Sequence, residues 1–205
     1  HIKLDHRNIV KCNRCSFVFA MEYSENELTR LYSESYYSSA KDPRMQEWIN
    51  RFQKTWQGLV DDLLNSKSLV GKLIDIGAGT GGFLLSFHQS SPQTKIFAVE
   101  SSAQAREHLL TKLDVLEFPV NSAEELHVIN DTFDAVVLLQ CLEHVNYPLL
   151  LCKQIFRILN EDGVLLLTVP NRFSVDAFFK NKKETRCFGN QTHLQFFSNS
   201  TLIAM

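Results

Sequence analysis

The stretch that decides the fold is Leu73-Ile74-Asp75-Ile76-Gly77-Ala78-Gly79-Thr80-Gly81-Gly82. A short apolar run containing one carboxylate leads into a turn that is rich in glycine. Glycine lets a backbone turn tightly and approach a ligand that a Cβ atom would keep away. Residues 82–89 then show helical spacing of apolar side chains. The stretch therefore predicts a strand, a ligand-binding turn and a helix.

More strands and helices are predicted on either side of this turn. Apolar runs at residues 96–99, 115–118, 135–139 and 164–169 alternate with helical patterns at 103–112 and 147–159. Runs this apolar suit strands that are covered on both faces. The alternation predicts an α/β protein with a Rossmann-like, doubly wound, mostly parallel sheet and helices on both faces. An amphipathic helix is predicted before the first strand, at residues 43–65.

Size and charge limit the classes of function. The 205 residues fit one α/β domain with an appendage, which we place at residues 41–205 and 1–40. The net charge of -2 gives no basic surface for nucleic acid, so nucleic acid is not expected as a partner. No apolar run has the length of a membrane span.

The two ends of the sequence give further expectations. The first residues lack the features of a secretory signal, so the expected location is cytoplasmic. Residues 201–205 are typical of the first turns of a helix without a stop signal, which indicates a fragment of a longer protein. The oligomeric state is left open by the sequence.

The glycine turn alone leaves two kinds of cofactor open. Gly77, Gly79 and Gly82 also match the dinucleotide fingerprint of nicotinamide enzymes. Asp75 favours a sulfonium cofactor with an amino-acid tail, because its carboxylate would attract an ammonium group and repel a pyrophosphate. Glu100 lies about twenty residues past the turn and can accept hydrogen bonds from both hydroxyls of a ribose. Glu100 fits either cofactor.

A family resemblance rests on four pieces that occur in order. They are residues 73–81, Glu100, Asn121-Ser122-Ala123-Glu124-Glu125-Leu126 and Phe133-Asp134-Ala135-Val136-Val137-Leu138-Leu139-Gln140-Cys141-Leu142-Glu143-His144-Val145. Together they resemble class I S-adenosylmethionine-dependent methyltransferases of the broad group that acts on small molecules. The resemblance covers about residues 71–171. It implies S-adenosylmethionine as the cofactor and methyl transfer to an oxygen, nitrogen or carbon of a small organic acceptor.

The resemblance also implies a role for particular residues. Those expected to bind the cofactor are Asp75, Gly77, Ala78, Gly79, Thr80 and Gly81 at the methionine and ribose end, Glu100 and Ser101 at the ribose, Ser122 and Ala123 at the adenine, and Gln140 near the methionine moiety. Related proteins often have an aspartate where this chain has Ser122.

Two histidines are candidate catalytic bases. His144 follows the fourth predicted strand, and His193 belongs to a His-x-x-x-Phe-Ser stretch that is frequent in the same group of methyltransferases. A base is needed only if the attacking atom carries a proton near neutral pH. For each histidine the alternative is a structural one, in which the ring holds a loop by hydrogen bonding.

The appendage contains Cys12-Asn13-Arg14-Cys15, which is half of a zinc site. His1 and His6 could complete the set of ligands, but no metal site is predicted, because a second pair of cysteines is missing. Two other functions are kept open: a binding or scaffold protein on the same fold, and a nicotinamide-dependent oxidoreductase. The helix at 43–65 and residues 32–37 and 173–197 are expected to cover the acceptor.

Overall fold

The computed structural model describes residues 2–4, 7–21, 43–67, 70–174, 187–190 and 192–205. Its elements are β1 (Ile2–Leu4), β2 (Arg7–Lys11), β3 (Val18–Met21), α2 (Pro43–Ser66), β4 (Lys72–Ile76), α3 (Gly82–Ser90), β5 (Lys95–Val99), α4 (Ala103–Leu110), the 3₁₀ helix η1 (Ala123–Val128), β6 (Phe133–Leu139), the 3₁₀ helix η2 (Leu142–His144), α5 (Pro148–Ile158), β7 (Leu159–Thr168), β8 (Gln195–Phe196) and α7 (Asn199–Ile203). No helix in these ranges combines the length and the apolar character that a bilayer-spanning helix needs.

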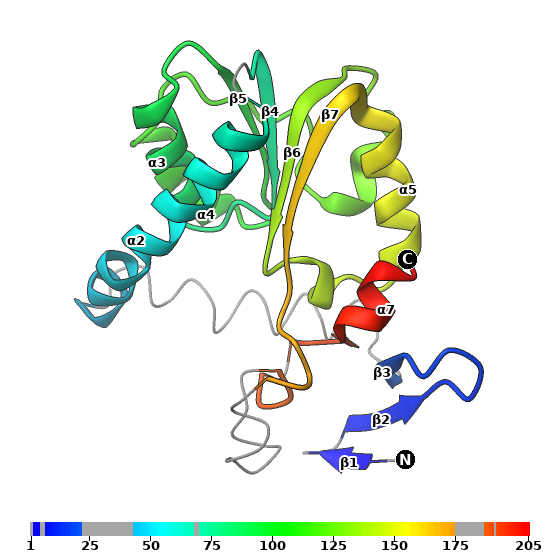
Figure 1. Cartoon of the computed structure of the whole chain (residues 1–205). Coiled ribbons are helices and arrows are strands. Elements are labelled where there is room, and N and C mark those ends of the chain that lie inside the picture. Colours follow the sequence, from blue (N-terminus) through cyan, green and yellow to red (C-terminus); the bar gives the residue numbers. More distant parts are fainter. Residues whose placement is uncertain (1, 5–6, 22–42, 68–69, 175–186, 191) are drawn as a thin grey trace.

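The centre of the molecule is a parallel sheet with the strand order β5-β4-β6-β7 (Figure 1). Along the chain, each strand of this sheet is connected to the next through a helix, as parallel pairing requires. The predicted doubly wound α/β fold is confirmed, and so are the helix before the first strand and four of the five predicted strands. All four strands point their carboxyl ends toward the same edge of the sheet (Figure 1).

Alternate residues of each central strand enter two separate cores. Leu73 of β4 packs with the α2, α3 and α4 side, whereas its neighbour Ile74 packs with the η1 and α5 side. Both side chains are fully buried, and each such side chain contributes about 1.5–3 kcal/mol of hydrophobic stabilisation. Helices therefore cover both faces of the sheet, which explains why the strands are apolar without interruption.

The strand predicted at residues 115–118 is wrong. Only Glu117 bridges to Phe97, through Ala98 N–H to Glu117 O at 2.9 Å and Glu117 N–H to Ile96 O at 3.3 Å. The chain turns at residues 111–115 before this point, and Pro119 soon after it has no N–H to donate. The segment therefore meets the edge of β5 at one residue instead of forming a ladder.

A second, antiparallel sheet has the order β1-β2-β3-β8 and lies on the side of the carboxyl edge of the main sheet (Figure 1). Val18 of β3 pairs with Phe196 of β8, and Ala20 N–H donates to Leu194 O at 2.8 Å. The N-terminal strands are thus hydrogen-bonded to a segment that follows the main sheet. The proposed domain boundary near residue 40 falls outside the described residues.

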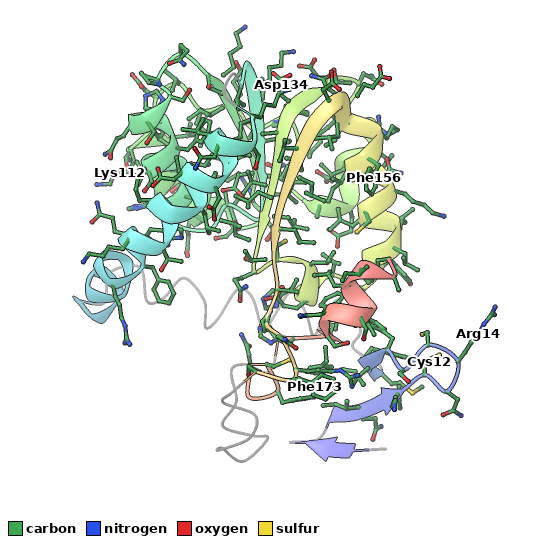
Figure 2. The ribbon with its side chains drawn as sticks, viewed as in Figure 1. Cys12, Arg14, Lys112, Asp134, Phe156 and Phe173 are labelled. Atoms are coloured by element: carbon green, nitrogen blue, oxygen red, sulfur yellow. The ribbon has the colours of Figure 1, made fainter. Side chains whose placement is uncertain are left out.

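Asp134 ties the amino ends of three strands together, at the end of the sheet away from the N-terminal strands (Figure 2). Its Oδ2 accepts from Gly71 N–H at 2.8 Å and from Lys72 N–H at 3.0 Å, and its Oδ1 accepts from the Asn160 amide at 2.9 Å. Burial raises the pKa of Asp134, but these hydrogen bonds outweigh it and leave the pKa below its usual value.

We predict that Asp134→Asn lowers the free energy of unfolding by about 1.5–3 kcal/mol, because charge-assisted hydrogen bonds to backbone N–H groups are lost. Asp131→Asn is the control, because its ion pair with Lys72 is exposed and contributes at most about 1 kcal/mol. Urea unfolding at neutral pH measures both. Because the folded-state pKa of Asp134 is lowered, its contribution should disappear as the pH falls through that pKa. Equal losses in the two variants would contradict this role.

Candidate active site

Two carboxylates meet at the carboxyl edge of the sheet. Asp75 lies near the end of β4, and Glu100 comes directly after β5. The two strands are parallel neighbours in which Ile76 pairs with Val99, so their tips lie side by side. Asp75 is 3% exposed and Glu100 is 5% exposed. The sequence-based expectation that these two residues share one edge is met by the register of the strands.

The glycine turn is held by backbone and carboxylate contacts. Gly77 and Ala78 donate their N–H groups to Val99 O at 2.8 and 3.2 Å. Glu100 accepts from Gly79 N–H at 2.8 Å through Oε2, and from Ser102 N–H at 2.8 Å through Oε1. Glu100 thus fixes the turn against β5. Each of its oxygens retains a further lone pair for another donor.

The glycines of the turn differ in what surrounds them. A Cβ atom on Gly77 would lie 2.7 Å from Cys141 Sγ, one on Gly81 would collide with Leu109, and one on Gly82 would collide with the Trp56 ring. At Gly79 the nearest atom is the backbone oxygen of Gly77 at 4.0 Å. Packing within the protein therefore excludes side chains at three of the glycines. Of the four glycines, only Gly79 has room for a Cβ atom.

The buried position of Asp75 makes its negative charge costly. Burial, and then repulsion from Glu100, raises the pKa of Asp75 to about 8. Within the described ranges, no hydrogen bond or ion pair to the Asp75 side chain is found. A cation placed beside this carboxyl would reverse the effect, because an opposite charge stabilises the ionised form.

The other residues expected to bind a cofactor lie around the same edge. Gln140 has a φ of 53° and donates its N–H to Thr168 O at 2.9 Å, so it lies where β6 and β7 end. Ser101 follows Glu100 and is exposed, and Thr80 is half-buried within the glycine turn. No contact of either side chain in the described structure points to a particular role.

The pair expected at an adenine lies on the η1 side of this edge. Ser122 precedes η1, and its N–H lies 3.4 Å from Glu125 Oε2. Ala123 lines a pocket of about 210 Å³ together with Glu124, His127 and residues of α5. This position is compatible with a ligand at Ala123, while the contact of Ser122 is a local one at the start of η1.

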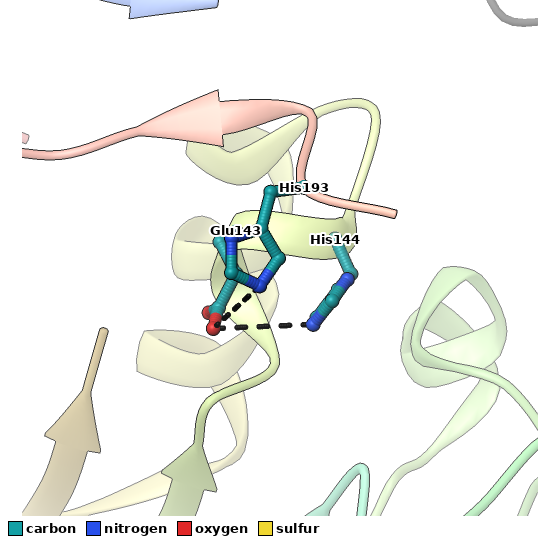
Figure 3. A group of neighbouring side chains, drawn as sticks. All are labelled: Glu143, His144 and His193. Carbon is teal, nitrogen blue, oxygen red and sulfur yellow. Dashed lines mark ion pairs between the residues drawn. The ribbon is translucent and has the colours of Figure 1, made fainter. Parts of the chain in front are cut away.

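The two candidate histidines meet in one cluster (Figure 3). The rings of His144 in η2 and His193 lie 4.8 Å apart at 71°, although almost fifty residues separate them in sequence. Glu143 lies between them, and its Oε1 is 3.9 Å from Nε2 of each ring. No role was predicted for Glu143 from the sequence. The sequence feature that could have indicated a role for it is the position of this carboxylate directly before His144, a candidate base.

Burial controls the charge of this cluster. It raises the pKa of Glu143 to about 8. Burial and then the neighbouring His193 lower the pKa of His144 to about 4. Both shifts favour the uncharged forms of the side chains, a protonated Glu143 and a neutral His144. A neutral imidazole can accept a proton or bind a metal ion through its lone pair.

The cysteine pair lies in the turn between β2 and β3, far from the parallel sheet (Figure 2). Cys12 N–H donates to Phe17 O at 2.8 Å, and Ser16 adopts a φ of 61°. Hydrogen bonds from Cys15 and Arg14 lower the pKa of Cys12, which favours its thiolate. His1 and His6, the candidates for completing a zinc site with this pair, lie outside the described residues.

Comparison with known proteins assigns the family. Residues 45–205 match the family described as methyltransferase domain, so the chain belongs to that family. The methyltransferase resemblance inferred from the sequence is thereby confirmed.

Curated relatives are similar over part of their length. The mitochondrial ubiquinone biosynthesis O-methyltransferase of Candida albicans is 29% identical over 127 residues, which are 58% of this chain and 37% of that protein. The demethylmenaquinone methyltransferase of Chlamydia muridarum is 29% identical over 115 residues, which are 52% of this chain and 50% of that protein. The match thus spans half or less of these relatives.

Solved structures share the fold. A SAM-dependent methyltransferase of Thermotoga maritima superimposes with a TM-score of 0.63 at 22% identity, over 85% of this chain and 77% of that one. The plantazolicin methyltransferase BpumL, solved in complex with SAH, gives a TM-score of 0.60 at 16% identity, over 87% of this chain and 75% of that one.

The glycine turn gives a prediction on stability. Gly79→Ala should cost only about 1–2 kcal/mol, the strain of a left-handed backbone carrying a Cβ atom. Gly81→Ala should cost about 2–5 kcal/mol, because the collision with Leu109 adds overpacking to the same strain. Thermal unfolding of the two variants measures the difference. A larger loss for Gly79→Ala would show that this glycine is also packed against the protein.

Proposed function

We propose that this chain binds S-adenosylmethionine and transfers its methyl group to an oxygen, nitrogen or carbon atom of a small organic acceptor. The observation that carries the proposal is the buried Asp75 carboxyl beside Glu100, next to the open Gly79 in the turn between β4 and α3. Membership of the methyltransferase family and the SAH-bound structure of a protein with the same fold support it.

The proposed cofactor fits this edge group by group. The ammonium group of its amino-acid tail would place a positive charge beside the Asp75 carboxyl and stabilise its ionised form. The ribose hydroxyls would donate to the lone pairs that Glu100 retains beside its bonds to Gly79 and Ser102. Ala78, Thr80, Gly81, Ser101, Ser122, Ala123 and Gln140 complete the proposed contacts.

The cofactor would supply an activated methyl group whose sulfur leaves without needing a proton. What remains for the protein is to align the acceptor, to exclude water and to accept a proton if the acceptor carries one. The glycine turn would help to align the two reactants, because it is held in a fixed position. Three of its glycines pack directly against Cys141, Leu109 and Trp56.

The cluster of His144, His193 and Glu143 is the proposed acceptor side of the site. It begins three residues after Gln140, and Cys141 between them contacts Gly77 of the glycine turn. We propose that the two histidines handle the acceptor proton, with His144 starting as a neutral imidazole. The helix α2 and the segment before β8 would cover the acceptor; residues 32–37, also expected there, lie outside the described ranges.

The names of the curated relatives favour a quinone-like aromatic acceptor. Both the ubiquinone biosynthesis O-methyltransferase and the demethylmenaquinone methyltransferase are named for quinones. A small-molecule acceptor, no nucleic-acid partner and a cytoplasmic location complete the proposal. A scaffold protein that has lost its cofactor and a nicotinamide oxidoreductase are the competing functions.

A binding experiment tests the role of Asp75. At pH 7, S-adenosylhomocysteine should release close to one proton per chain, because the ammonium group converts a carboxyl with a pKa of about 8 into a carboxylate. The release should vanish above about pH 9, where Asp75 is already ionised. Calorimetry in buffers with different ionisation enthalpies measures it. Asp75→Asn should bind without proton release, whereas release that persists in this variant would contradict the assignment.

A reaction screen separates the three functions. With S-adenosylmethionine and a set of catechols, phenols, amines and sugars, an enzyme should release S-adenosylhomocysteine in the presence of at least one acceptor. A scaffold without a cofactor site should show no heat with S-adenosylhomocysteine. An oxidoreductase should change the fluorescence of NADH instead, and that result would overturn the proposal.

A further inference from the structure

One ligand atom from each of Glu143, His144 and His193 converges on a common point. These three atoms lie within 4.8 Å of one another, and Glu143 Oε1 is 3.9 Å from Nε2 of each histidine (Figure 3). The residues come from two distant segments, η2 and the stretch before β8. Leu194 N–H donates to Glu143 O at 2.8 Å and joins these segments. The convergence therefore depends on the fold.

Backbone carbonyls orient both imidazole rings. Nδ1 of His144 lies 3.0 Å from Thr192 O, and Nδ1 of His193 lies 2.7 Å from Cys187 O. A carbonyl oxygen only accepts, so in each neutral ring Nδ1 carries the hydrogen and Nε2 carries the lone pair. Histidines that bind metal ions are commonly oriented in this way, by a hydrogen bond from the other ring nitrogen.

In this cluster, the cost of burial is least offset by other interactions at Glu143. Its side chain is 1% exposed, and neither carboxylate oxygen has a hydrogen-bond partner in the part of the chain that the structure describes. Burying a carboxyl group without a partner costs free energy, and a bound cation is one of the few ways to compensate it. The Nε2 atoms of both histidines lie 3.9 Å from Oε1 of this carboxyl group, so three possible ligand atoms surround one point, which suits a cation.

We propose that Glu143, His144 and His193 bind one divalent transition-metal ion. Two imidazoles and a carboxylate suit ions such as Zn²⁺, Co²⁺, Mn²⁺ or Fe²⁺, whereas Mg²⁺ and Ca²⁺ prefer oxygen ligands. Ligands of a tetrahedral ion bound at about 2.0–2.1 Å lie roughly 3.3 Å apart, so binding draws the three side chains slightly inward. Three protein ligands leave at least one position for a further oxygen.

A metal ion here would also narrow the acceptor class, a step that rests on the proposed function. A hydroxyl oxygen bound to such an ion loses its proton far more readily than a free hydroxyl. The acceptor would then be a phenol, catechol or enol whose oxygen occupies the remaining position. In this arrangement the two imidazoles hold the metal ion, and the proton of the bound hydroxyl passes to solvent water instead of to a histidine. The oxygen then forms the bond to the methyl carbon as the bond from that carbon to the sulfur breaks, and S-adenosylhomocysteine leaves.

Titration with Co²⁺ alone tests the site. Because Cys12 and Cys15 are also potential ligands, the experiment uses the wild-type chain and a Cys12→Ser, Cys15→Ser variant in parallel. The double variant should bind one Co²⁺ per chain, with visible ligand-field bands and without the near-ultraviolet charge-transfer band of a thiolate ligand. Equilibrium dialysis gives the stoichiometry independently.

Variants of the cluster then locate the ion. In the double-variant background, Glu143→Gln and His193→Gln should each weaken Co²⁺ binding by about 100-fold or more. His127→Gln is the matched control, since this exposed histidine lies outside the cluster and should leave binding unchanged. Circular dichroism checks that each variant is folded. No Co²⁺ binding in the double variant, or binding that survives both cluster substitutions, would overturn the proposal.

The same samples separate this inference from the proposed function. S-adenosylhomocysteine should still bind to Glu143→Gln, because Asp75 and Glu100 are unchanged in that variant. Cofactor binding without Co²⁺ binding would overturn the metal site and leave the proposed function standing. Failure of the wild-type chain to bind S-adenosylhomocysteine would overturn the proposed function, whatever Co²⁺ does.

Discussion

The side chain of Asp75 is buried beside Glu100 at the carboxyl edge of the parallel sheet, and repulsion between the two adds to the cost of burial. This arrangement follows from the topology, because parallel neighbours β4 and β5 bring their tips together. A ligand that carries a positive charge and hydrogen-bond donors would stabilise the ionised forms of both groups. The Glu100 carboxylate also fixes the glycine turn, because it accepts from Gly79 N–H and Ser102 N–H.

The turn uses glycine for two different reasons that the sequence motif does not distinguish: some positions have no room for a side chain, and one leaves room beside the backbone. Gly77 lies against Cys141, the residue before η2. Gly81 lies against Leu109 of α4, and Gly82 lies against Trp56 of α2. The turn is therefore packed against three surrounding segments. At Gly79, by contrast, a Cβ atom would have room, and the N–H of this residue is bonded to the Glu100 carboxylate. The rigid part of the turn thus positions an open part, which is the arrangement that a cofactor cradle needs.

Much of the fold could be predicted, because the spacing of apolar residues within a segment indicates which of its faces are buried, and so whether it is a strand or a helix. The strands at residues 73–76 and 135–139 and the helix from Pro43 were predicted in this way. The strand expected at residues 115–118 was wrong, because nearby turns and Pro119 limit pairing in a manner that periodicity does not register. The pairing of β3 with β8 joins residues far apart in sequence and left no local pattern to detect.

The candidate site was predictable to a similar extent. Asp75 and Glu100 could be placed together from strand order alone, whereas the meeting of His144 with His193 depends on the long connection before β8. Glu143 escaped attention because a glutamate beside a histidine looks like an ordinary surface residue until its burial is known.

The most direct measurement compares two ligands that differ only in the tail that Asp75 should bind. S-adenosylhomocysteine carries an amino-acid tail, and 5′-methylthioadenosine lacks it while keeping the adenosine and the sulfur. Calorimetric titration should show that Asp75→Asn weakens S-adenosylhomocysteine by about 10- to 100-fold, a loss of about 1.4–2.8 kcal/mol, and leaves methylthioadenosine unchanged. Equal weakening of both ligands, or of neither, would contradict the assignment of Asp75 to the ammonium group.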